Sequence, residues 1–266
     1  MQKNSLLTIF LVAVSTLIIV SCSEYEKVLK SNDYDFKYRK AVQYYEKKDY
    51  ARAITIFEQI VSYFRASTKG DSLMYLFAQS YYGDEDYTMA GFYFKELSDN
   101  YARSPFVEEA DYMVGYCYYL VSPRASLDQE NTNLAVAAFQ KFIYKHPSSK
   151  YTPECKRLIK ELQDKLAEKA YLNAKLYYDL KYYKAAIIAL NNCLTQYPES
   201  SHREKLMFML LDAKYELALN SITEKQKERF QNALDEYYSY VAEYPKGQYD
   251  KQVTKIFNKA KEVLGL

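Results

Sequence analysis

Apolar and small residues along residues 41–57 repeat at helical spacing on both sides of a short polar turn. Ala41 and Tyr45 lie four positions apart, and Ala53 and Phe57 repeat that spacing after the turn. The small side chains of Ala41 and Ala53 allow two helix backbones to approach closely. A helical hairpin this short cannot bury its apolar face alone, so the pattern predicts that similar hairpins pack against it.

The pattern recurs along the chain from a small residue in each first helix, which we call the landmark. The five landmarks are Ala41, Ala78, Gly115, Ala174 and, with a weaker match, Ala213. A second small residue follows in the second helix of each repeat, at Ala53, Ala90, Ala135, Ala186 and Ala233. In the third and fifth repeats this second helix is displaced by eight residues. In three repeats a proline that ends the second helix lies twelve residues after the small residue of that helix, at Pro147, Pro198 and Pro245.

Tyrosine is the compositional outlier, with 31 Tyr and no Trp, and it keeps a fixed place in four repeats. One tyrosine lies three residues before the landmark and another four residues after it, which puts both within about 20° on one helix face. We call these residues the tyrosine stripe: Tyr38, Tyr45, Tyr75, Tyr82, Tyr112, Tyr119, Tyr171 and Tyr178. The stripe offers large, rigid contact area with polar tips, which favours binding of an extended aromatic peptide segment. The alternative is that the array uses tyrosine as an amphipathic filler.

A second tyrosine set, three residues after the landmark, points about 100° away from the stripe. These residues are expected to pack against neighbouring helices: Tyr44, Tyr81, Tyr118 and Tyr177.

Five hairpins in register over residues 34–247 resemble the tetratricopeptide-repeat family. The resemblance implies an all-α, right-handed solenoid with its first helices, and so the tyrosine stripe, on the concave face. A long helical pattern between Pro153 and Tyr178 divides the expected array into an N-terminal half, 34–155, and a C-terminal half, 156–266. The last segment, 249–264, has one apolar stripe and predicts a capping helix, or a helix offered to a partner.

The N-terminal residues 1–21 have the form of a signal peptide, since Lys3 precedes a short apolar run. The run ends in Ile-Val-Ser-Cys, which resembles a bacterial lipobox and predicts cleavage before Cys22 with lipid on its thiol. Residues 22–33 would then be a lipidated leader that holds the body at a membrane. A short transmembrane anchor with an incidental cysteine is the alternative.

Lipobox, leader and repeats together resemble the BamD family of outer-membrane protein assembly lipoproteins. The corners that begin at Tyr101, His146 and Tyr197 resemble that family's corners, and Arg124 with the polar residues after it resembles its third-repeat insertion. The resemblance implies a scaffold on the periplasmic side of the outer membrane that works with other assembly lipoproteins. Its C-terminal half would dock on the barrel subunit BamA, and its N-terminal half would receive C-terminal targeting segments of unfolded outer-membrane proteins.

Other functions receive little support from the residues. The charge is close to neutral, with 36 basic and 34 acidic residues, so bulk electrostatics does not predict nucleic-acid binding. His146 and His202 have no cysteine or acid nearby in a catalytic or metal-binding spacing, and no cofactor is expected apart from the lipid. Three cysteines in helical patterns are expected as buried apolar residues: Cys117, Cys155 and Cys193. A periplasmic adaptor for division or wall synthesis stays open, and so does a glycan-binding surface lipoprotein, although the lack of Trp disfavours it.

Overall fold

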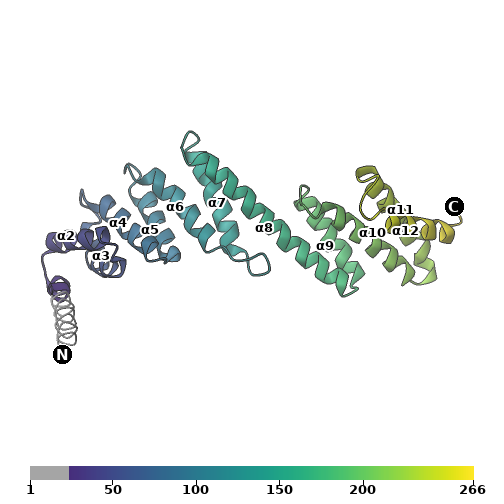
Figure 1. Ribbon diagram of the computed structural model, residues 1–266, viewed down its shortest axis with the longest axis horizontal. Helices are drawn as coiled ribbons and strands as arrows, with labels where there is room; N and C mark the ends of the chain where they lie inside the picture. Colours follow the sequence, from purple (N-terminus) through teal and green to yellow (C-terminus); the bar gives the residue numbers. More distant parts are fainter. Residues whose placement is uncertain (1–23) are drawn as a thin grey trace, which may run out of the picture. The chain divides into compact units, whose positions relative to one another are not determined.

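The computed structural model describes residues 24–266, which are helical and contain no strand (Figure 1). A helical segment at 24–30 is followed by α2 (Tyr34–Glu46), α3 (Tyr50–Phe64), α4 (Gly70–Gly83), α5 (Tyr87–Asn100), α6 (Val107–Leu120), α7 (Glu130–Lys145), α8 (Thr152–Asp179), α9 (Tyr183–Gln196), α10 (Arg203–Leu219), α11 (Thr223–Glu243) and α12 (Asp250–Leu264). Successive helices form hairpins and α12 follows the last one, which confirms an all-α, tetratricopeptide-like fold. The signal peptide and Cys22 lie outside the described residues. No helix in the described part of the chain is long and apolar enough to cross a membrane.

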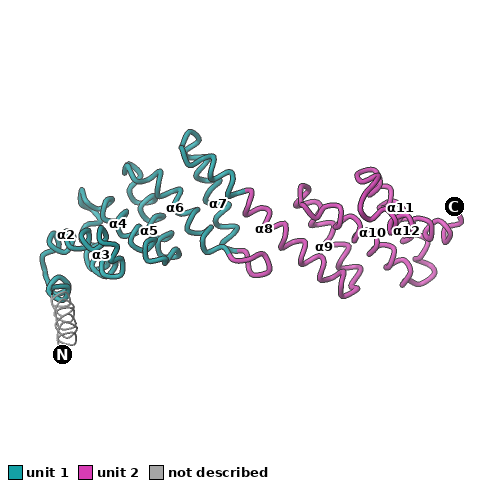
Figure 2. The backbone as a smooth tube through the Cα atoms, viewed as in Figure 1, with its two compact units in different colours: residues 1–122, 130–159 teal, residues 123–129, 160–266 magenta. Residues whose placement is uncertain are grey.

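The chain forms two compact units (Figure 2). Unit 1 contains the residues up to Ser122 together with 130–159, and unit 2 contains 123–129 and 160–266. Helix α8 therefore begins in unit 1 and ends in unit 2. Each unit is described by itself below.

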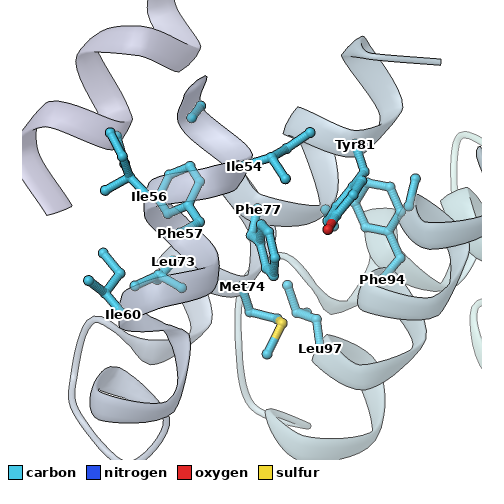
Figure 3. Packing of buried hydrophobic residues seen from close by; sticks show 14 of the residues in the cluster. Ile54, Ile56, Phe57, Ile60, Leu73, Met74, Phe77, Tyr81, Phe94 and Leu97 are labelled. Carbon is cyan, nitrogen blue, oxygen red and sulfur yellow. The ribbon is translucent and has the colours of Figure 1, made fainter. Parts of the chain in front are cut away.

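The core of unit 1 follows the predicted small-residue contacts. Ala41, Ala53, Ala78 and Ala90 have no exposed surface, and large apolar side chains fill the space between their helices. Figure 3 shows this packing, in which the rings of Phe57 and Phe77 lie 6.0 Å apart. Fully burying one such side chain stabilises the fold by about 1.5–3 kcal/mol, so the apolar cluster holds successive hairpins together.

Gly115 shows why one landmark is glycine. A Cβ atom at Gly115 would lie 2.6 Å from the ring of Phe139, which is fully buried against this point of α6. The closest approach between the first and second helices of this repeat therefore leaves no room for a methyl group.

Three hairpins turn through the same backbone conformation, seven residues after the landmark. Lys48, Glu85 and Lys181 have φ values of 61°, 64° and 59°, in the left-handed region. The next amide in each turn donates to a carbonyl five residues earlier, for example Asp49 to Tyr44 at 2.9 Å. This is the Schellman type of helix ending, formed here by residues other than glycine.

In the fifth repeat the structure moves the landmark from Ala213 to Leu211. Leu211 shares a core cluster with Ala233 of α11, whereas Ala213 packs with the α9 residues Ala186 and Leu190. The predicted position was therefore wrong by two residues, because α10 buries small or apolar side chains on two faces and either face offers a landmark.

Candidate functional site: the tyrosine stripe

The stripe members that lie three residues before the landmark connect neighbouring repeats. In unit 1, the ring of Tyr75 stacks on Phe106 and the ring of Tyr112 stacks on Tyr151, with centroids 4.4 Å apart in each pair. The ammonium group of Lys69 lies 5.5 Å from the ring centroid of Tyr38. Each partner lies directly before the first helix of the next repeat, so these tyrosine rings connect one repeat to the next.

The members that lie four residues after the landmark pack within their own hairpins. Tyr45 contacts the turn residue Tyr50 with ring centroids 5.9 Å apart, and Tyr82 contacts Tyr87 at 5.5 Å. Tyr119 stacks on Tyr116, one turn earlier in α6, at 5.8 Å. All three stripe tyrosines are half-buried, so each presents only part of its ring and its polar tip to solvent.

A polar cluster lies beside the stripe in unit 1. The hydroxyl of Tyr75 donates to Oε1 of Glu109 at 2.8 Å, and Nε2 of Gln79 donates to the same carboxylate oxygen at 3.2 Å. Burial raises the pKa of Tyr75, and the hydrogen bond to Glu109 raises it further. Burial also raises the pKa of Tyr45, and Tyr50 and Glu109 contribute in the same direction, so Tyr45 lies within electrostatic reach of this carboxylate.

Several hydroxyl groups of the stripe in unit 1 are free to bind. Within residues 24–266, the hydroxyls of Tyr38, Tyr45, Tyr82 and Tyr112 form no hydrogen bond with the protein. Burial raises the pKa of each of them, so each stays a protonated donor at neutral pH. Unit 1 therefore combines open donors with the acceptor oxygens of Glu109.

The two stripe tyrosines of unit 2 serve the interior instead. Tyr171 is only 5% exposed and stacks on His202 with centroids 4.0 Å apart. The hydroxyl of Tyr178 donates to Oδ2 of Asp212 at 2.5 Å. Burial raises the pKa of Asp212, and the hydrogen bond from Tyr178 opposes that shift. Six stripe residues therefore lie in unit 1, on α2, α4 and α6, and the other two are buried or hydrogen-bonded in unit 2.

The comparisons with known proteins agree with this architecture. The family model described as an outer membrane lipoprotein, YfiO, matches residues 31–230 and again 177–265. The chain belongs to this family. It is similar to the putative outer membrane protein assembly factor BamD of Aquifex aeolicus, with 26% identity over 83% of this chain and 72% of that protein. It is also similar to BamD of Haemophilus influenzae, with 22% identity over 80% of this chain and 84% of that protein.

A similar solved structure is the P58(IPK) TPR domain, which is 14% identical to this chain. The match covers 94% of this chain and 68% of that domain's chain. Its TM-score is 0.40.

Sequence reasoning missed five residues beside the stripe. Gln79 and Glu109 complete the polar cluster, and Tyr116 supports Tyr119. In unit 2, the ring of Phe208 stacks on Tyr249 with centroids 4.4 Å apart. Tyr249 lies directly before α12, just as Phe106, the partner of Tyr75, lies directly before α6. Phe208 and Tyr215 lie seven residues apart, so the stripe spacing continues into the fifth repeat once Leu211 is its landmark.

The second tyrosine set is only partly internal. Tyr81 is buried, and its hydroxyl donates to Oε1 of Glu58 in α3 at 2.7 Å. Tyr44 contacts Tyr25 with centroids 5.7 Å apart, and Tyr118 is half-buried. The prediction was wrong for Tyr177, which is 42% exposed.

Both histidines pair with carboxylates that are distant in sequence. Nε2 of His146 lies 2.9 Å from Oδ2 of Asp111, and Nε2 of His202 lies 2.5 Å from Oε2 of Glu168. The hydroxyl of Ser98 donates to Asp111 rather than to His146, so these residues do not form a nucleophile–base pair. In each pair the carboxylate lies on the first helix of a repeat, and the histidine lies in the corner after the second helix of that repeat.

The structure also places the remaining candidate groups. No group of three or more His, Cys, Asp or Glu side chains suited to a metal ion occurs between residues 24 and 266. Three cysteines are buried and unpaired, as predicted: Cys117, Cys155 and Cys193. Burial raises the pKa of Cys117 to about 12 and that of Cys155 to about 11, so neither thiol is activated.

Proposed function

We propose that the chain is a lipid-anchored scaffold of outer-membrane β-barrel assembly. Lipid on Cys22 would hold it at the outer membrane with its body in the periplasm. Unit 1 would bind extended segments of unfolded outer-membrane proteins, and unit 2 would dock on a BamA-like barrel subunit beside other assembly lipoproteins. The family description and the names of the relatives support the assembly role.

The observation that carries client binding is the set of unbonded hydroxyls in unit 1. Tyr45 and Tyr82 are held by ring contacts to Tyr50 and Tyr87, so their hydroxyls need little ordering when a ligand arrives. An extended peptide exposes carbonyl oxygens that accept from such donors and amides that donate to an acceptor such as Glu109. Unit 1 offers both kinds of partner next to aromatic surface.

Unit 2 differs in the same positions. Its stripe tyrosines are buried or bonded to Asp212, so they offer no comparable set of open donors. This difference favours unit 1 as the client site and leaves unit 2 for docking to the assembly machinery.

The proposal has a direct biochemical test in two parts. The mature lipidated chain should bind a fluorescent peptide copied from the C-terminus of an outer-membrane β-barrel protein of the same organism. Extraction of the chain from membranes should also recover a BamA-like barrel subunit. Recovery of wall-synthesis or division enzymes without a barrel subunit would contradict the assembly role, and failure of the peptide to bind would contradict the client role.

A further inference from the structure

An exposed leucine row runs along the second half of α8 and continues to Leu180, directly after the helix ends, in unit 2. Leu172, Leu176 and Leu180 follow one another at four-residue spacing and are 36%, 56% and 52% exposed. Tyr177, on the same part of α8, is 42% exposed. Apolar side chains gathered on one helix face in this way mark an interaction surface.

The corresponding positions in other repeats are covered. Leu172 and Leu176 lie two residues before and two residues after the landmark Ala174. In the third repeat these positions are Met113 and Cys117, both buried, and the backbone of α5 at Gly91 leaves only 3.2 Å between an added Cβ and the Cβ of Cys117.

The fifth repeat shows the same covering. Its equivalent positions are Met209 and Ala213, which are buried in one cluster with Leu190 of α9. In both repeats, the second helix of the preceding hairpin covers this face of the first helix.

The first repeat shows how an open end differs. Its equivalent residues, Arg39 and Gln43, are polar and stay exposed, although the 24–30 helix packs on a neighbouring part of α2. The fourth repeat instead exposes leucines, so its composition is that of a covered face.

Helices that cover such faces in unit 1 carry an acid toward the helix beneath. Glu58 of α3 accepts from the hydroxyl of Tyr81 at 2.7 Å. In the 24–30 helix, Glu24 accepts from Nζ of Lys40 at 2.6 Å, and Val28 is fully buried. Tyr177 occupies the same repeat position as Tyr81, and its hydroxyl has no partner within the described part of the chain.

The charges beside the leucine row have the complementary sign. Lys181 and Lys184 follow its C-terminal end and form no ion pair or hydrogen bond through their side chains within residues 24–266. Asp179, two residues before Lys181, is already bonded to Lys175. Nζ of Lys169, at the other end of the row, donates to the carbonyl of Ser126 at 3.0 Å.

We propose that the leucine row docks an acidic amphipathic helix of a partner protein. The partner helix takes the place that a preceding second helix occupies in other repeats. Its apolar face covers Leu172, Leu176 and Leu180, one carboxylate accepts from Tyr177, and others lie near Lys181 and Lys184.

The test places a photo-reactive benzoylphenylalanine at position 176 of the full-length lipidated chain in its own cells. Position 144 serves as the control, because Tyr144 is also apolar and is 89% exposed on α7. The expected result is an adduct at 176, absent at 144, whose sequenced peptide comes from a partner protein and has an acidic amphipathic helical pattern.

Charge reversal makes the test specific. Lys181→Glu with Lys184→Glu should reduce the adduct yield, whereas Lys141→Glu on α7 should not. Lys181→Glu keeps the turn intact because Glu85 adopts the same left-handed conformation at the equivalent position.

The proposal is overturned if position 176 gives no more adduct than position 144, or if charge reversal leaves the yield unchanged. It is also overturned if the adduct is lipid, a second copy, another segment of the same chain, or a partner segment without that pattern. If position 176 of the unaltered chain gives no adduct while a barrel subunit still co-purifies, the leucine row is not a docking surface and the proposed docking role of unit 2 is unaffected.

Discussion

Removing the hydroxyls of Tyr45 and Tyr82 should weaken client binding without weakening the fold. Neither hydroxyl is bonded to a residue that the structure describes, so Tyr45→Phe with Tyr82→Phe breaks no intramolecular hydrogen bond. The rings keep their contacts with Tyr50 and Tyr87. A hydrogen bond contributes about 0.5–1.5 kcal/mol net, so two lost bonds correspond to roughly 5- to 150-fold weaker affinity.

The assay is fluorescence anisotropy with the labelled C-terminal client peptide, together with thermal unfolding of the same samples. Tyr144→Phe is the matched control, because it removes an exposed hydroxyl of unit 1 away from the stripe. The double variant should lose affinity at unchanged Tm, and the control should change neither. Unchanged affinity in the double variant would refute the role of these hydroxyls, and a fall in Tm would refute the reasoning that they are free.

Three further predictions concern the framework that holds the stripe. Asp111→Asn should lower the free energy of unfolding at pH 7 by about 1.5–3 kcal/mol, because the donors around Asp111, including His146, lose a charged acceptor. Burial alone would raise the pKa of Asp111, but its hydrogen bonds hold the pKa below the ordinary value. The stabilisation by Asp111 is therefore present above about pH 4 and is lost as pH falls through the folded-state pKa. Urea unfolding of the Asp111→Asn variant that shows the same pH dependence as the unaltered chain would contradict the assignment. Gly115→Ala should destabilise by about 1 kcal/mol in urea unfolding, since a clash of about 1–3 kcal/mol with Phe139 exceeds a helix-propensity gain of about 1 kcal/mol, and a more stable variant would show that the contact relaxes freely. Cys117 should react with Ellman's reagent at pH 8 only after unfolding, because burial raises its pKa to about 12, and rapid labelling of the native chain would contradict that burial.

Much of the architecture was predictable because close helix contacts demand small residues at fixed spacing. Ala41, Ala53, Ala78 and Ala90 occupy the buried contacts that their periodicity predicts. The fifth repeat was harder because Leu211 is large, so its role shows only through the packing of Ala233 against it.

The site was less predictable because its chemistry depends on contacts between repeats. Tyr75 lies three residues before its landmark and Tyr178 lies four residues after its landmark, yet each hydroxyl meets an acid on the following first helix, Glu109 in α6 and Asp212 in α10. Each acid lies 34 residues after its tyrosine, a separation that no local pattern records. Tyr177 likewise matched the packing set by its position in the repeat, yet it is 42% exposed.

The central claim is that unit 1 holds an extended client segment along the tyrosine stripe, and the most direct measurement labels the protein from the client. A C-terminal outer-membrane protein peptide with a photo-reactive group is bound to the mature chain, irradiated, and the labelled residues are mapped by mass spectrometry. The labels should fall in α2, α4 and α6 near Tyr45, Tyr82 and Tyr119, and should be competed by unlabelled peptide. Labels confined to unit 2, or spread evenly over both units, would contradict the claim.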